Sequence, residues 1–131
     1  GLIAAITQDR TAFLDGFSRG FCNWSPEGGA EVEALRERVV AIAAQASVLG
    51  TAECVRAFGT TDLRADVAKI AVTVLVVHGT ADLLVPFEGS SKRLAAMLPR
   101  SRTVLINGAG HGLAMTHSDE VTTAIETFIK E

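Results

Sequence analysis

The spacing of apolar residues in the first half of the chain predicts helices. Between Leu2 and Phe21 the apolar residues recur mostly three or four positions apart, and the pattern is interrupted near residues 9–11. The segment "CNWSPEGG" then predicts a loop, because it is rich in Gly, Pro and Ser. A second apolar stripe runs through residues 30–50 and has acidic residues in its first turn. Residues 51–58 are long enough for a short third helix.

The pattern changes at Val72. The continuous run "VTVLVV" predicts a strand that is buried on both faces, as strands of parallel sheets are. The segment "PFEGSSKRLAAMLP" predicts a helix bounded by prolines, and "TVLI" (Thr103–Ile106) predicts a second strand. A strand, a helix and a strand over about 35 residues predict a right-handed βαβ unit. A closing helix over Asp119–Lys130 is expected to turn four apolar residues inward: Val121, Ile125, Phe128 and Ile129.

Composition narrows the class of protein. With 131 residues and 48% hydrophobic content, the chain can form one domain with a core. The net charge of -3, without a basic stripe, argues against nucleic acid as a partner. No apolar run reaches the length of a membrane span, and "GLIAAITQDR" has no basic leader, so we expect a cytoplasmic protein without a membrane partner. Cys22 and Cys54 lie far apart and are expected to be buried thiols; no metal or cofactor is predicted.

Two chemically useful side chains follow the two predicted strands. The first strand runs into "HGTADLLVP", which contains Asp82, and the second runs into "NGAGHG", which contains His111. Because the carboxyl ends of adjacent parallel strands meet at one edge of a sheet, we expect these side chains to lie close together. A carboxylate there can accept the Nδ1 proton of the imidazole, as in a catalytic triad. The sequence therefore predicts an acid and base pair.

Simpler interpretations exist for each of these residues. An Asp after a strand is commonly a turn former, and a single His is commonly a surface or packed residue. The placement of Asp82 and His111 on consecutive strand ends favours the paired interpretation. We expect His78, at the end of the first strand, to pack or form a local hydrogen bond, and His117 to brace the start of the last helix.

The same segments resemble a known family. "VLVVHGTADLLVPFEGSSKRLAAML" and "INGAGHGLAMTHSDEVTTAIETFI" resemble the C-terminal half of the cofactor-free bacterial haloperoxidase and esterase group of α/β-hydrolases. The resemblance implies that Asp82 and His111 are the acid and base of a Ser-His-Asp triad. It implies a partial α/β-hydrolase fold in one folding unit: a helical cap-like segment (1–65), then a parallel βαβ unit and C-terminal helix (66–131). The first six strands and the nucleophile of that family have no counterpart here.

The stretch "GFSRG" matches the G-x-S-x-G pattern of a nucleophile elbow around Ser18. An elbow needs a buried strand directly before the serine, whereas residues 12–15 have helical spacing and Asp15 precedes Gly16. The resemblance also assigns this segment to the cap. We therefore interpret "GFSRG" as a chance match on a helix.

Two functions remain open on the sequence. The first is a serine hydrolase, esterase or haloperoxidase-like, that acts on a small ester-like substrate once an N-terminal half supplies the serine; the isolated chain is then inactive. The second is a non-catalytic homodimer. Two strands are too few to shield a strand as apolar as residues 72–77, so we expect that strand to pair with a second copy of itself or with the missing half.

Overall fold

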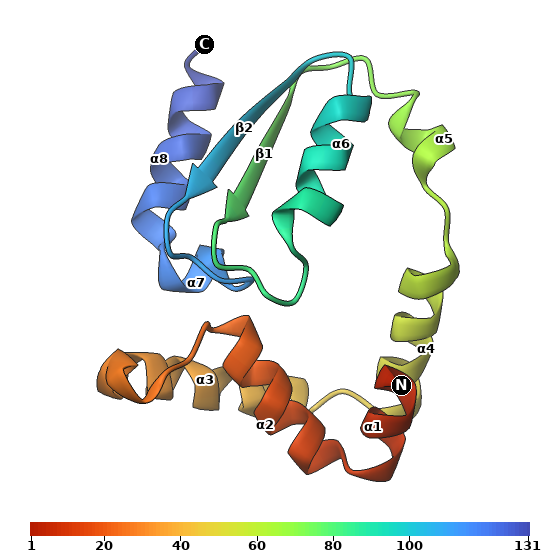
Figure 1. The fold of residues 1–131 in the computed structure, drawn as a ribbon, viewed down its shortest axis with the longest axis vertical. Coiled ribbons are helices and arrows are strands. Elements are labelled where there is room, and N and C mark those ends of the chain that lie inside the picture. Colours follow the sequence, from red (N-terminus) through yellow and green to blue (C-terminus); the bar gives the residue numbers. More distant parts are fainter. The chain divides into compact units, whose positions relative to one another are not determined.

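A computed structural model describes residues 1–131, and most of the chain is helical, with one small sheet (Figure 1). Its elements, in chain order, are α1 (Leu2–Gln8), α2 (Arg10–Phe21), η1 (Pro26–Gly28), α3 (Gly29–Ala43), α4 (Val48–Thr60), α5 (Arg64–Val67), β1 (Val74–Gly79), η2 (Phe87–Gly89), α6 (Ser91–Met97), β2 (Ser101–Ile106), α7 (Leu113–Thr116) and α8 (Ser118–Ile129). The break predicted near residues 9–11 is present, because α1 ends at Gln8 and α2 begins at Arg10.

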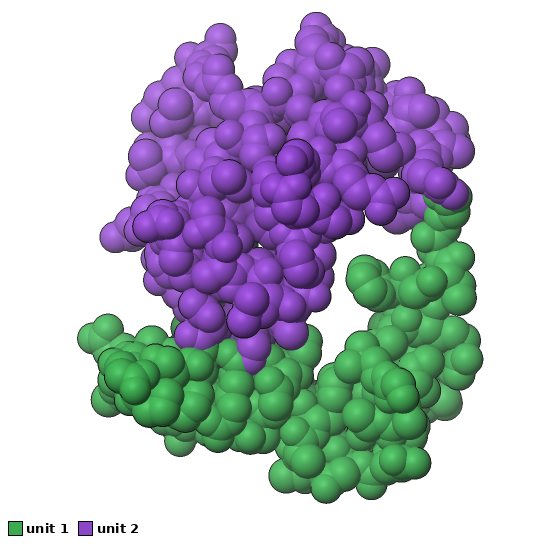
Figure 2. Space-filling model, in the orientation of Figure 1, with its two compact units in different colours: residues 1–19, 24–62 green, residues 20–23, 63–131 purple.

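The chain divides into two compact units, shown in green and purple in Figure 2. Unit 1 consists of residues 1–19 and 24–62, and unit 2 consists of residues 20–23 and 63–131. The short segment 20–23, which contains the end of α2, thus belongs with the sheet. The prediction of one folding unit with a boundary near residue 65 stays a prediction.

Unit 1 is held together by apolar packing and by one arginine. Helices α1 and α4 pack against each other, and Ile6 and Ala52 are buried. The Arg10 guanidinium donates to the carbonyl oxygens of Ala43 and Ala46, at 2.8 and 2.7 Å, and to Thr51 Oγ1 at 3.2 Å. Because these acceptors lie at the end of α3 and the start of α4, Arg10 joins the start of α2 to the connection between those helices.

Unit 2 is built on two parallel strands. Strand β1 pairs with β2 in a register that places Val74 beside Ser101 and Gly79 beside Ile106. Helix α6 connects the strands, and α6 and α8 flank the pair and contact both strands (Figure 1). Both strands therefore end at the same edge of the sheet, and the predicted βαβ unit is confirmed.

The structure changes several details of the sequence prediction. The helix predicted over residues 30–50 ends at Ala43, and the short helix predicted over residues 51–58 is part of α4, which begins at Val48 and ends at Thr60. Strand β1 begins at Val74 rather than Val72, because β2 offers its first partner only there. The helix predicted between the two prolines is divided into η2 and α6 by Ser90, whose backbone is not helical (φ -128°, ψ -93°). Of the residues expected to face inward on α8, Ile125 and Ile129 are exposed, because a two-stranded sheet is too narrow to cover that side of the helix.

Two further features bear on the sequence prediction. No single helix has the length and apolar character needed to cross a membrane; only Pro26–Ala43 and Val48–Thr60 taken together do, and they meet at a bend of 100°.

Cys22 is buried, whereas Cys54 is exposed on α4, so the expectation of two buried thiols is wrong for Cys54. Cys54 lines an open pocket with residues of α1 and α2, among them Leu2 and Phe13, so solvent reaches its side chain.

Candidate active site

The turn after β1 fixes the Asp82 side chain. The chain leaves the strand at Gly79, and the Asp82 amide donates to the Gly79 carbonyl oxygen at 3.2 Å. Asp82 Oδ1 accepts the backbone N–H groups of Leu84 and Val85, at 3.0 and 2.9 Å. Its side chain is only 3% exposed. The carboxylate therefore shapes its own loop by the local hydrogen bonding typical of Asp in turns, and one oxygen is left for another partner.

The loop after β2 brings His111 to the same edge. The Ala81 amide donates to the Ala109 carbonyl oxygen at 2.9 Å, so the two strand-end loops are joined by a backbone hydrogen bond. This approach requires Gly79, since a Cβ at that position would lie 2.2 Å from the Ala109 carbonyl oxygen. The glycine at the end of β1 thus lets the loop carrying His111 lie directly against the loop carrying Asp82.

Asp82 and His111 form a close pair. His111 Nδ1 lies 2.8 Å from Asp82 Oδ2, which is the distance of a charge-assisted hydrogen bond. Burial alone would raise the pKa of the Asp82 carboxyl, but the Val85 amide, the His111 ring and the Leu84 amide together hold that pKa below its ordinary value. Asp82 is therefore ionised at neutral pH and fixes the Nδ1–H tautomer of His111. In that tautomer Nε2 is the ring nitrogen that can accept a proton.

The segment 20–23 of unit 2 packs against the His111 loop. The Phe21 ring meets the imidazole edge to face, with centroids 5.5 Å apart, and the Phe21 carbonyl oxygen accepts the Gly112 amide at 2.7 Å. Asn23 Nδ2 donates to the Gly108 carbonyl oxygen at 3.3 Å. The imidazole remains 37% exposed, so it is held in place without being sealed. Sequence reasoning missed Phe21 and Asn23, because nothing in a local pattern shows which distant loop they reach.

His78 lies closer to the pair than the sequence indicated. Its side chain is 8% exposed, its Nδ1 is 2.8 Å from Ser91 Oγ, and its Nε2 is 3.6 Å from Asp82 Oδ2. His78 thus forms a hydrogen bond, as expected, but with the first residue of α6, thirteen positions away, rather than with a neighbour in the chain. The position of His78 in β1, directly before Gly79, was the only sign in the sequence that it would face the same edge.

Ser18 does not lie on a nucleophile elbow. It is inside α2, is fully buried, and donates to the Asp15 carbonyl oxygen at 2.8 Å in the helical turn before it. An elbow serine stands exposed on a turn between a strand and a helix. The interpretation of "GFSRG" as a helical segment is therefore confirmed.

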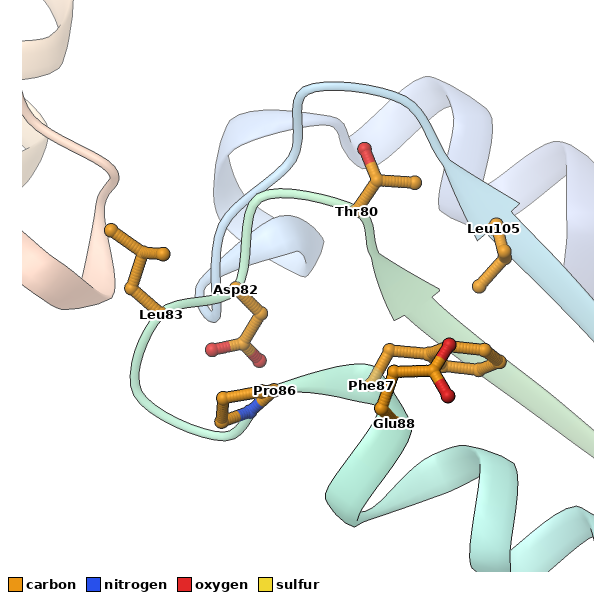
Figure 3. Close-up of a pocket in the computed structure, with 7 residues that line it drawn as sticks. All are labelled: Thr80, Asp82, Leu83, Pro86, Phe87, Glu88 and Leu105. Atoms are coloured by element: carbon orange, nitrogen blue, oxygen red, sulfur yellow. The ribbon is translucent and has the colours of Figure 1, made fainter.

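A pocket of about 350 Å³ opens beside the acid of the pair. Figure 3 shows Asp82 between Leu83 and Pro86, in the loop that leaves β1. The rest of the lining comes from the ends of β1 and β2 and from η2, namely Thr80, Phe87, Glu88 and Leu105. The volume is in the range of small-molecule sites, and most of the lining is apolar.

Comparisons with known proteins identify the family of this chain. The profile of the TAP-like protein family, a family of α/β-hydrolases, matches residues 42–131, which include both strands, Asp82 and His111. The chain belongs to the TAP-like protein family. The chain has the fold class predicted from its sequence, a partial α/β-hydrolase fold.

Proteins similar to this chain include haloperoxidases and esterases. The crystal structure of a bromoperoxidase from Bacillus anthracis is 39% identical, has a TM-score of 0.86, and is matched over 98% of this chain and 46% of its own. An esterase from Exiguobacterium antarcticum is 28% identical, with a TM-score of 0.85, over 99% of this chain and 46% of its own. A non-heme chloroperoxidase from Streptomyces lividans is 29% identical over 97% of this chain and 46% of its own length.

The chain spans about half the length of the curated relatives it matches. The match to this chain covers 47%, 42% and 46% of the lengths of three such relatives. The resemblance to the C-terminal half of a haloperoxidase or esterase of the α/β-hydrolase superfamily is thus confirmed. The catalytic role of Asp82 and His111 stays a prediction.

Proposed function

We propose that this chain supplies the acid and base of a serine hydrolase, an esterase or a haloperoxidase-like enzyme. The observation that carries the proposal is the 2.8 Å contact between His111 Nδ1 and the buried, ionised Asp82 carboxylate. The nucleophilic serine is supplied by protein outside these 131 residues, in keeping with the half-length match to the relatives. The substrate is a small ester.

The chemistry follows from the orientation of the imidazole. His111 Nε2 takes the proton of the serine hydroxyl as the serine oxygen attacks the ester carbonyl carbon, and it then gives that proton to the departing alcohol. Water then attacks the acyl carbon while His111 Nε2 takes its proton, and His111 returns that proton to the serine oxygen as the bond to serine breaks and the carboxylic acid is released. Asp82 stays ionised throughout and stabilises the imidazolium that forms in each step.

Complementation with a relative tests this proposal. The part of the Bacillus anthracis bromoperoxidase that this chain does not match is fused to the N-terminus of this chain, and hydrolysis of p-nitrophenyl acetate is measured. We expect activity in the fusion and negligible activity in the chain alone. Replacing Asp82 by Asn should lower kcat by about 10⁴-fold, because the carboxylate that sets the His111 tautomer is lost. His117→Ala is the matched control and should leave kcat unchanged.

A fusion that folds but stays inactive would overturn the proposal. Folding is checked independently, by a cooperative unfolding transition and by circular dichroism. An active fusion whose activity survives both Asp82→Asn and His111→Ala would also contradict it, since the activity would then come from elsewhere.

A second candidate function is a non-catalytic homodimer. The observation that favours it is the arrangement of the sheet, in which β1 pairs with β2 on one edge and with no other strand of this chain. Unit 2 also exposes large apolar side chains, including Leu105 on β2 and Ile129 on α8. Activity in the fusion would favour the hydrolase; a stable dimer and an inactive fusion would favour this alternative.

A further inference from the structure

His78 carries a buried polar atom without a hydrogen-bond partner. The side chain is 8% exposed, Nδ1 lies 2.8 Å from Ser91 Oγ, and Nε2 has no hydrogen-bond partner. Leaving a buried polar atom unsatisfied destabilises the fold, so such atoms are rare and call for an explanation. An apolar residue in β1 would avoid this cost.

Nε2 of His78 faces the carboxylate of the proposed triad. It lies 3.6 Å from Asp82 Oδ2, the same oxygen that His111 Nδ1 approaches at 2.8 Å. At 3.6 Å the contact is longer than a hydrogen bond. It is an electrostatic contact between a ring nitrogen and a charge, and such contacts are strong where little water enters. The Phe87 ring also lies against His78, with centroids 5.5 Å apart.

The Asp82 carboxylate favours one tautomer of His78, and Ser91 is compatible with it. If the ring carries its proton on Nε2, the Ser91 hydroxyl can donate to Nδ1 and the Nε2–H dipole points its positive end at the carboxylate. If the ring carries its proton on Nδ1 instead, the Nε2 lone pair faces an anionic oxygen, which is repulsive. The Ser91 hydroxyl fits either tautomer, because it can donate to Nδ1 or accept from Nδ1–H, so the Asp82 contact is the one that favours Nε2–H.

The geometry points to His78 as a positioning residue for Asp82, held with Nε2–H toward Oδ2 by Ser91. It favours the ionised carboxylate and fixes the oxygen that receives the His111 Nδ1–H. This inference deepens the proposed function. The effect of His78 on catalysis rests on that proposed function. The chain thus places two histidines on one carboxylate oxygen: His111, which acts on the substrate, and His78, which acts only through Asp82.

The first experiment observes the proton itself. A long-range ¹H–¹⁵N correlation spectrum of the uniformly ¹⁵N-labelled chain at pH 7 distinguishes the ring nitrogens of His78, which are assigned with His78→Leu. We expect a protonated Nε2. An unprotonated Nε2 would overturn the inference. This measurement needs no activity and no variant that must function.

The second experiment observes the effect on Asp82. The ¹³C shift of the Asp82 carboxyl is followed from pH 7 to low pH in the wild-type chain, in His78→Leu and in the matched control His117→Leu. Other groups near Asp82 are the same in all three chains, namely His111, the Leu84 and Val85 amides, and Glu88, which lines the same pocket. We expect the Asp82 titration to move to higher pH only in His78→Leu, because the ionised form loses one favourable contact.

The outcomes separate this inference from the proposed function. An Asp82 titration that is unchanged in a folded His78→Leu chain would show that His78 only fills space, whatever the fusion enzyme does. A protonated Nε2 and a shifted Asp82 titration would support the positioning role even if the fusion proved inactive. In an active fusion, His78→Leu should lower kcat and leave KM near its original value, because His78 does not touch the substrate.

Discussion

The Asp82 carboxylate is 3% exposed and still ionised, because its oxygens face two backbone amides and the His111 ring. A buried charge without such partners would be neutralised by a raised pKa. The donors therefore do two things at once. They stabilise the loop after β1, and they preserve the negative charge that orients His111.

The hydrogen bonds to the ionised Asp82 carboxylate predict that the stability of the fold depends on pH. Because the pKa of Asp82 is lower in the folded chain than in the unfolded chain, its contribution is complete above the unfolded pKa of about 3.9 and is lost as the pH falls through the folded pKa. We expect Asp82→Asn to lower the free energy of unfolding by about 1 to 3 kcal/mol at pH 7. The difference from the wild-type chain should shrink below about pH 4. Urea unfolding at several pH values measures it.

A constant difference between the two chains from pH 7 to pH 3 would contradict this explanation. It would mean that the asparagine weakens the loop for reasons of shape, and that the charge of Asp82 does not contribute to stability.

At the scale of single elements, the helical structure of α2 shows that "GFSRG" is not a nucleophile elbow. Ser18 is buried inside this helix, and a Cβ added to Gly16 would meet no atom within 4 Å. An elbow needs its glycines for close backbone approach, whereas a helix interior is weakened by glycine.

Gly16→Ala should therefore raise the free energy of unfolding by about 0.5 to 1 kcal/mol. Ser18→Ala should leave esterase activity unchanged, both in the chain alone and in the fusion. Thermal unfolding and p-nitrophenyl acetate hydrolysis measure these effects. Loss of esterase activity in Ser18→Ala, with the fold intact, would restore Ser18 as a nucleophile.

At the end of β1, in contrast to Gly16, Gly79 has no room for a Cβ atom. A Cβ at Gly79 would lie 2.2 Å from the Ala109 carbonyl oxygen, a backbone atom that cannot move aside alone. We expect Gly79→Ala to lower the free energy of unfolding by about 1 to 3 kcal/mol, the usual cost of overpacking. It should also separate the loops that carry Asp82 and His111, and so lower kcat in the fusion.

Gly59→Ala is the matched control for this substitution. Gly59 lies in α4, and a Cβ there meets nothing within 4 Å. The control should be neutral or slightly stabilising, because alanine favours a helix. Equal stability of Gly79→Ala and the wild-type chain would show that the loops tolerate a wider separation than the structure indicates.

At the scale of the whole molecule, the open edge of β1 predicts association. Val74 N and Thr80 N donate to Arg100 and Ile106 on the β2 side, so the intervening odd-numbered residues present their amides to the other edge. Unpaired strand edges are sites of pairing with further chains. We expect the isolated chain to be a homodimer in which two copies of β1 pair antiparallel around a two-fold axis.

Proline at Leu75 tests the dimer without breaking the sheet. It removes one amide of the open edge, and no amide that donates to β2. Light scattering after size exclusion should give a dimer for the wild-type chain and a monomer for Leu75→Pro. A wild-type monomer, or a Leu75→Pro dimer, would refute pairing through this edge.

Local patterns of apolar and polar residues were enough to predict part of the fold. The continuous apolar run before His78 predicted β1, and the strand, helix and strand order predicted a parallel pair, because such crossovers are right-handed and bring strand ends together. From that order alone, Asp82 and His111 were expected at one edge, and the structure places them 2.8 Å apart. Helical spacing likewise excluded an elbow at Ser18.

The side chains that surround Asp82 and His111 could not be predicted from those patterns and are known only from the fold. Phe21 reaches His111 across most of the chain, and His78 faces Asp82 because the turn after Gly79 folds the carboxylate back toward the strand. Sequence patterns report which way a residue faces within its own helix or strand, since those periods are fixed by local backbone geometry. They do not report how loops pack on one another, because that depends on contacts such as Gly79 against Ala109, between residues far apart in the chain.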